Sequence, residues 1–444
     1  MKRLLLLSLS LALSAGCSSS PDPSSPGPDQ ELSEQAAAIS IDPYKELMIV
    51  HPTVVNDSTR TNNMTGGHWG FRWIMERLSS NSGMAPGVFV EHWLKQFHET
   101  TVPGKNLPLR DRQGVDELLS KWKRDASGRL DLRYSPFKLM AVTNRIDKGT
   151  SLGDMGEGRF VFALVDPDTL GDPANPQAAT PLSMTVIFEF HLPGKPTTPE
   201  KDNAQRQRNA KKWHALGSLA FGESYNHELQ LITDAFVTTY GPDSLNQLRT
   251  NEIALGGPGL IRGEPGSNDT NQIWELREYK IVGGKFAVAP VQATAGDIWV
   301  KDPTFGQFLL DNRDAVLAGK VNLGDFAGYT ASEDFARTRW EFPTVNGAPY
   351  PEDVRSAFAK GTCNGCHNAE QASFAAPQFP EGSQLGFLHI SPFHDTTRPS
   401  SDPLAGTERV SAFLKNTDIP RRVTFMKGVL DNASSTLGET KFGH

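Results

Sequence analysis

Apolar residues recur along the chain at two spacings, and each spacing predicts one kind of element. The segment 184–192 has an apolar side chain at every second position, which predicts a strand with one buried face. The segment 113–123 has apolar residues three and four positions apart, which predicts an amphipathic helix. Further strands are predicted at 138–142, 160–165, 273–282 and 286–291, the last two joined by a hairpin turn at Gly283-Gly284, and further helices at 68–78, 89–97 and 226–240.

This mixture of patterns indicates an α+β fold class. We expect a large mixed helix/sheet domain over 41–346, with a partly antiparallel sheet. A second, small and mainly α-helical unit is expected at 347–444, with helices at 350–360, 408–415 and 421–432. Between its helices, 368–407 is rich in Pro and Gly, as in loops that wrap a ligand or serve a function.

The N-terminus has the pattern of an export signal. Lys2 and Arg3 precede a mostly apolar run over 4–15, which is too short to span a bilayer and has the length of a signal-peptide core. Small residues then lead to Cys17, as in a bacterial lipobox. We therefore predict a lipoprotein signal peptide at 1–16, lipid attachment at Cys17 and a Ser/Pro-rich tether at 17–40. The alternative is an ordinary secretory signal that happens to precede a cysteine.

The charge balance and the cysteine count exclude some classes of partner and of fold. The 444 residues include 44 Lys and Arg against 51 Asp and Glu, a net charge of −7, and no basic run exceeds two residues. This argues against nucleic acid as a partner. The other two of the three cysteines, Cys363 and Cys366, are three positions apart, so a disulfide framework is excluded as the basis of the fold.

The clearest chemical motif is Cys363-Asn364-Gly365-Cys366-His367, a C-x-x-C-H string. Thiols at i and i+3 face the same way on a helical turn, so both can form thioethers with one porphyrin, and the next histidine can bind its iron. One such string predicts one covalent haem c. An exported protein suits this chemistry, because c-type haem is attached outside the cytoplasmic membrane.

A second iron ligand is expected downstream of His367. We rank His389 first, with Met426 and His394 as alternatives and the terminal His444 as a further option. The predicted function is one-electron transfer by a membrane-anchored mono-haem cytochrome, a carrier rather than a stand-alone enzyme. Its partner would be a redox protein or a small-molecule donor or acceptor. Two alternatives stay open, a non-redox recognition lipoprotein with a Cys/His zinc site and a haem enzyme with an open sixth position.

Charged residues gather where the predicted elements of the large domain end. If they converge in space, they form a buried ion network or bind a ligand, and the network is the default interpretation. The members are Asn144, Arg145 and Asp147; Glu157 and Arg159; Arg249, Asn251 and Glu252; and Arg277 and Glu278.

Several strings resemble a group of exported bacterial lipoproteins with a C-terminal c-type cytochrome domain. They are SPFKLMAVTNRID at 135–147, GEGRFVF at 156–162, WHALGSL at 213–219, RTNEIAL at 249–255 and TCNGCH at 362–367. The resemblance covers most of 65–430 and implies an architecture and a haem, without a substrate. The export signal and the lipobox predict a location on the periplasmic or outer face of a bacterial envelope membrane, held by the lipid anchor alone.

Overall fold

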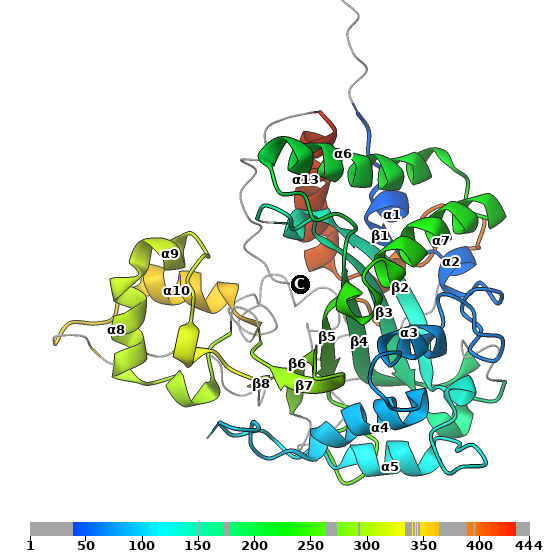
Figure 1. Ribbon diagram of the computed structural model, residues 1–444. Coiled ribbons are helices and arrows are strands. Elements are labelled where there is room, and N and C mark those ends of the chain that lie inside the picture. Colours follow the sequence, from blue (N-terminus) through cyan, green and yellow to red (C-terminus); the bar gives the residue numbers. More distant parts are fainter. Residues whose placement is uncertain are drawn as a thin grey trace, which may run out of the picture. The chain divides into compact units, whose positions relative to one another are not determined.

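The chain is described by a computed structural model in which helices surround one central sheet (Figure 1). The structure describes residues 39–105, 107–149, 151–172, 178–262, 273–291, 294–333, 340, 342, 344, 347–363, 389–393 and 397–431. Its strands are β1 Met48–Ile49, β2 Phe137–Arg145, β3 Glu157–Val165, β4 Pro181–His191, β5 Leu245–Glu252, β6 Trp274–Val282, β7 Lys285–Ala289 and β8 Ala331–Glu333. Its α-helices are α1 Pro43–Glu46, α2 Pro52–Val55, α3 Phe71–Leu78, α4 Pro86–Lys95, α5 Gly114–Lys121, α6 Pro199–Ala215, α7 Glu223–Thr238, α8 Pro303–Asp311, α9 Arg313–Leu317, α10 Glu352–Gly361 and α13 Ile419–Leu430. The predicted mixed helix-and-sheet fold is confirmed.

Within the described residues, eight strands form one antiparallel sheet. Seven of them follow one another in chain order from β1 to β7, and β8 pairs with β6. The predicted hairpin between β6 and β7 is present. Gly283 and Gly284 both have positive φ, 58° and 75°, as the two central residues of a type I′ turn require.

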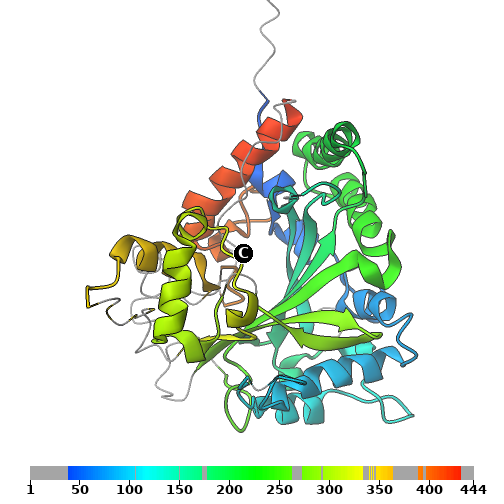
Figure 2. The ribbon, with the colours of Figure 1, turned by 60° about the vertical axis from the view of Figure 1, so that its left-hand side comes forward.

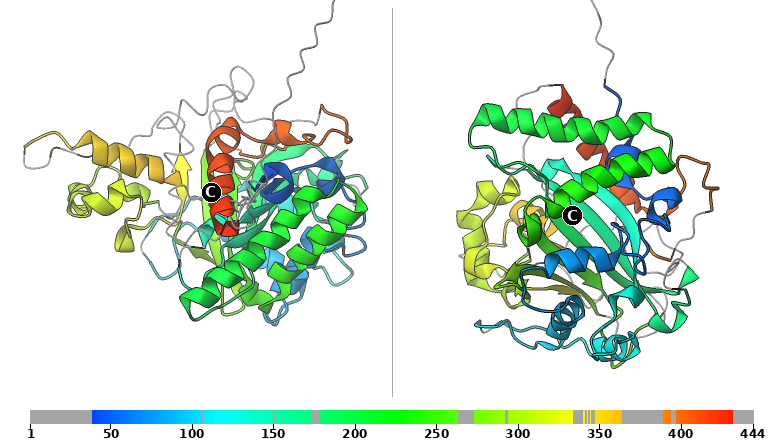
Figure 3. Two further views of the ribbon diagram at one scale, coloured as in Figure 1. Left: turned by 90° about the horizontal axis from the view of Figure 1, so that it is seen from above. Right: turned by 45° about the vertical axis from the view of Figure 1, so that its right-hand side comes forward.

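One face of the sheet carries the main hydrophobic core. The apolar set predicted for 184–192 faces it, and Phe188 contacts Phe71 of α3 with ring centroids 5.9 Å apart. Phe236 of α7 packs on Phe160 of β3 at 5.5 Å. The long helices α6 and α7 belong to this layer and lie on one side of the strands in the right-hand view of Figure 3. Each of these helices buries its apolar stripe against the apolar face of the sheet. This burial explains why the segments with these two periodicities form helices and strands here.

The other face is covered near β1, β2 and β3 by residues from the C-terminal part of the chain. Ile390, Phe413 and Ile419 pack against Met140 and Val161 in a separate apolar cluster. Helix α13 begins at this second cluster with Ile419, whereas its Met426 and Leu430 reach the main core, and Figure 2 shows the helix on the other side of the strands from α7. None of the described helices is both long enough and apolar enough to cross a bilayer.

Helix α10, which leads to the C-x-x-C-H string, belongs to a third apolar cluster. Val354 and Phe358, four residues apart, pack there with Phe305 of α8 and Trp340. Glu352 and Asp353 lie in the first turn of the helix and Lys360 in its last turn, which complements the helix dipole. Cys363 lies two residues after the end of this helix.

Candidate functional site: a buried charged face beside Cys363

Four charged side chains form a row across adjacent strands on the second face of the sheet. Arg159 of β3 is in register with Glu189 of β4, and Arg249 of β5 is in register with Glu278 of β6. Side chains alternate between faces along each strand, so this register brings all four to one side. Glu189 has an exposed fraction of 0 % and Arg249 and Glu278 have 1 % each.

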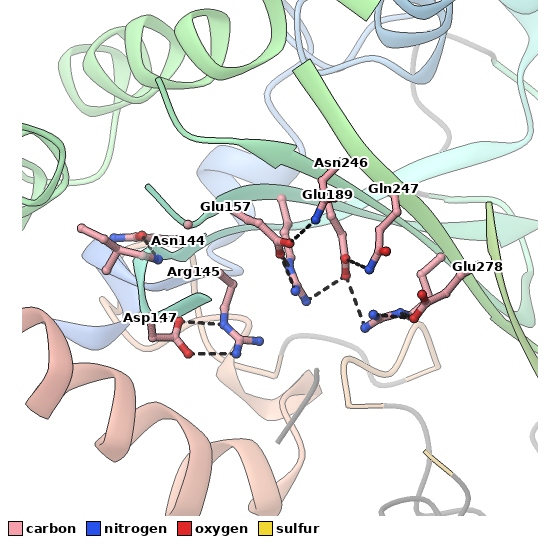
Figure 4. A network of polar contacts seen from close by, with 12 residues as sticks. Asn144, Arg145, Asp147, Glu157, Glu189, Asn246, Gln247 and Glu278 are labelled. Atoms are coloured by element: carbon pink, nitrogen blue, oxygen red, sulfur yellow. Dashed lines mark hydrogen bonds and ion pairs between the residues drawn. The ribbon is translucent and has the colours of Figure 1, made fainter. Parts of the chain in front are cut away.

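The row is held together by ion pairs that share Glu189 (Figure 4). Its Oε1 lies 3.0 Å from Nη1 of Arg159 and 3.3 Å from Nη1 of Arg249. Gln247 donates from Nε2 to its Oε2 at 2.6 Å, and Arg249 places Nη2 2.7 Å from Glu278 Oε1. Taking these charges out of water is costly, so pairing is what allows them to be buried.

A second group of charges lies where β2 ends. Arg145 forms a bidentate pair with Asp147, with both N–O distances 2.9 Å. Asp418 and Arg422, at the start of α13, form a buried pair that interacts with Arg145. Burial and the charge of Arg145 lower the pKa of Arg422 to about 10 and that of Lys148 to about 7. This end of the face is therefore rich in positive charge.

The opposite face carries matching buried pairs. Arg112 places Nε 2.7 Å from Glu252 Oε1, and Arg277 places Nε 2.5 Å from Glu275 Oε1. Glu252 and Arg277 thus point away from the row, although their neighbours Asn251 and Glu278 lie on its side. Of the charged and polar residues named from the sequence, Arg145, Glu157, Arg159, Arg249 and Glu278 converge on this face. Asn144, Glu252 and Arg277 lie on the helix-covered face, because side chains alternate along each strand.

Cys363, the first cysteine of the motif, lies beside this row. It has an exposed fraction of 5 % and packs with Trp274 and Leu276 of β6. Its backbone N–H donates to Thr294 Oγ1 at 2.9 Å. Burial raises the pKa of the thiol to about 11, and the nearby Arg249 guanidinium acts in the opposite direction.

His389 reaches the same face from another part of the chain. With Arg249, Asn251, Leu276 and Ile187 it lines a cavity of about 60 Å³. Its Nδ1 lies 3.2 Å from Ser411 Oγ, and burial lowers the pKa of the imidazole to about 4. The ring is therefore neutral at pH 7, which is the form that binds a metal.

Met426 has a different environment. It is fully buried in the main core, and Asn144 Nδ2 lies 3.8 Å from its sulfur. Of the predicted site residues, the structure thus brings Cys363 and His389 to one face and places Met426 in the core. Cys17, Cys366, His367, His394 and His444 lie outside the described residues. Among the described ones, no group of three or more His, Cys, Asp or Glu side chains is arranged to hold a metal ion.

Four members of the charged face are not singled out by the sequence, namely Lys148, Glu189, Asp418 and Arg422. Alternation along 184–192 places Glu189 opposite the apolar residues, on the side of a strand that in an antiparallel sheet is commonly solvated. Asp418 and Arg422 carry an i, i+4 signal that also occurs on exposed helices. Comparison with protein-family models, with curated proteins and with solved structures gave no match.

Proposed function

We propose that the protein is an exported, lipid-anchored c-type cytochrome that transfers single electrons through one covalent haem. The observation that carries the proposal is the Cys363-Asn364-Gly365-Cys366-His367 string. Its first cysteine is fixed by α10 on one side and by the hydrogen bond from its N–H to Thr294 on the other. The partner in electron transfer would be a redox protein or a small-molecule donor or acceptor.

The residues present suit this group. Cys363 and Cys366 would hold the porphyrin by thioethers, and His367 would bind the iron. The apolar side chains of Trp274 and Leu276 around Cys363 suit a porphyrin edge. When bound, haem supplies an iron that alternates between Fe(II) and Fe(III), and the chain tunes its potential through ligands, burial and nearby charge.

We favour His389 as the second ligand. It lies on the same face as Cys363, lines the cavity with Arg249 and is kept neutral by burial. Met426 is a weaker candidate because its sulfur would have to leave the main core, where the side chain has no exposed surface. His394 remains an alternative second ligand, on the basis of the sequence.

Covalent haem is tested on denaturing gels stained for haem peroxidase activity. The protein is expressed in a host that matures c-type cytochromes. Wild type should carry the stain, and Cys363→Ala or Cys366→Ala should strongly reduce it. Cys17→Ser is a matched control, because it removes a cysteine that lies outside the motif. The exported Cys17→Ser protein should still carry the stain. Purified protein with stoichiometric zinc and no stain would refute the proposal in favour of the zinc site.

The lipid anchor is a separate part of the proposal and has its own test. We expect Cys17→Ser to leave the membrane fraction or to accumulate unprocessed, because the acyl chains are attached to that sulfur. Fractionation and immunoblotting of both proteins measure this. Unchanged processing and membrane partition in the variant would exclude the anchor and leave the haem proposal untouched.

A further inference from the structure

We propose that the charged face of the sheet is the floor of the haem site, and that Arg249 and Glu278 set the reduction potential with opposite signs. This inference rests on the proposed cytochrome function. It assigns a role to residues of the large domain that are far from the motif in sequence, because Arg249 is in β5 and Cys363 follows α10, 114 positions later.

Two observations from different parts of the chain indicate where the haem would lie. Cys363 belongs to the same apolar cluster as Leu276, which is in register with Asn251, two residues from Arg249. His389 lines the same cavity as Arg249, Asn251 and Leu276. Cys363 and His389 would hold the haem at this part of the sheet, where Arg249 and Glu278 form their ion pair (Figure 4).

Charge at this position acts strongly because it is shielded from water. Arg249 and Glu278 are both almost fully buried, and interactions between charges are larger in such surroundings than at a surface. Reduction adds one negative charge to the iron. A buried cation close by stabilises the reduced form and raises the potential, and a buried carboxylate lowers it.

The sheet supplies a matched control. Arg277 and Glu275 form an equally buried pair on the opposite face, where Arg277 Nη1 also donates to the carbonyl of Gln96 at 2.9 Å. Substitutions there disturb the same strands and leave the charge beside Cys363 unchanged. A purely structural role for Arg249 and Glu278 predicts the same outcome at both pairs.

The experiment is a redox titration of haem-loaded protein followed by its absorption spectrum. We expect Glu278→Gln to raise the potential, Arg249→Met to lower it, and the double variant to lie between the two. Glu275→Gln and Arg277→Met should leave the potential at the wild-type value. Glu278→Gln keeps the size of the side chain, so it serves if Arg249→Met fails to fold.

Two results are distinguished by this design. Wild-type protein without haem overturns the proposed function itself. Protein with haem, in which Glu278→Gln titrates at the wild-type potential or shifts no more than Glu275→Gln, overturns the inference and leaves the cytochrome standing.

Discussion

Lys148 is a residue of the charged face whose burial lowers the stability of the fold. It follows Asp147, and burial together with the positive charge of Arg145 lowers its pKa from 10.5 to about 7. Between these two values the unfolded chain binds a proton at Lys148 that the folded chain does not. The free energy of unfolding therefore rises as the pH rises through that window. Below pH 7 the buried lysine is charged and destabilises the fold by its full amount.

Lys148→Met should therefore stabilise the protein more at pH 6 than at pH 9, by about 1–2 kcal/mol after allowing for partial exposure of the side chain. Urea unfolding of both proteins at the two pH values measures the difference. Lys211→Met, at an exposed position on α6, should have the same effect at both. Equal effects of Lys148→Met at pH 6 and pH 9 would show that the lysine is not under this strain.

The second iron ligand is also decided by single residues. With haem bound, His389→Ala should open the sixth position, giving high-spin iron that binds carbon monoxide when reduced. Met426→Leu conserves the volume of a core side chain and should leave the spectrum as it is, at a cost below about 1.5 kcal/mol in unfolding free energy. Loss of the low-spin spectrum in Met426→Leu, with His389→Ala unchanged, would reverse the assignment.

For single residues, the sequence predicts which side chains carry charge better than it predicts what surrounds them in the fold. The Arg and Glu residues of the row are recognisable in the strands, and alternation assigns each one to a face. What covers that face depends on residues far along the chain, such as His389 and Asp418, whose contacts no local pattern reports. This is why Glu189 looks like an exposed strand residue in the sequence and is fully buried in the fold.

Among the elements, β3 and α7 meet at a position where only glycine fits. A Cβ added at Gly158 would lie 2.3 Å from Cδ1 of Phe236. Gly158→Ala must push α7 away from the sheet, so we expect a loss of about 1–3 kcal/mol in urea unfolding at an unchanged m value. Gly361→Ala, where an added Cβ meets nothing within 4 Å, is the control and should not destabilise. Equal midpoints for Gly158→Ala and wild type would contradict this packing.

The elements themselves were largely predictable from periodicity. The strands at 184–192 and 273–282 and the helices at 113–123 and 226–240 are confirmed to within a few residues. The helix predicted at 408–415 is wrong in its first half, because the helix begins only at Ala412. That segment contains a short 3-10 turn, Thr407–Arg409, and a π-helix begins at Leu414 and runs into α13. Pro420 explains the π-helix, because it has no N–H to donate to the carbonyl four residues earlier.

For the whole molecule, the sequence separates two regions near residue 347, and described residues from both sides share apolar clusters. Phe358 of α10 packs with Phe305 of α8, and Met426 of α13 lies in the main core. The chain from Ile39 onward forms one compact unit. Composition marks a change in loop content at this point, but it carries no information on which surfaces pack together. The separate haem unit expected at 347–444 therefore stays a prediction.

The absorption spectrum of the exported, purified protein tests the central claim most directly. We expect the spectrum of one low-spin c-type haem per chain, which sharpens on reduction with dithionite and does not change when carbon monoxide is added. A high-spin spectrum that responds to carbon monoxide would indicate a haem enzyme with an open sixth position. A protein without haem absorption, from a host that matures other c-type cytochromes, would contradict the account.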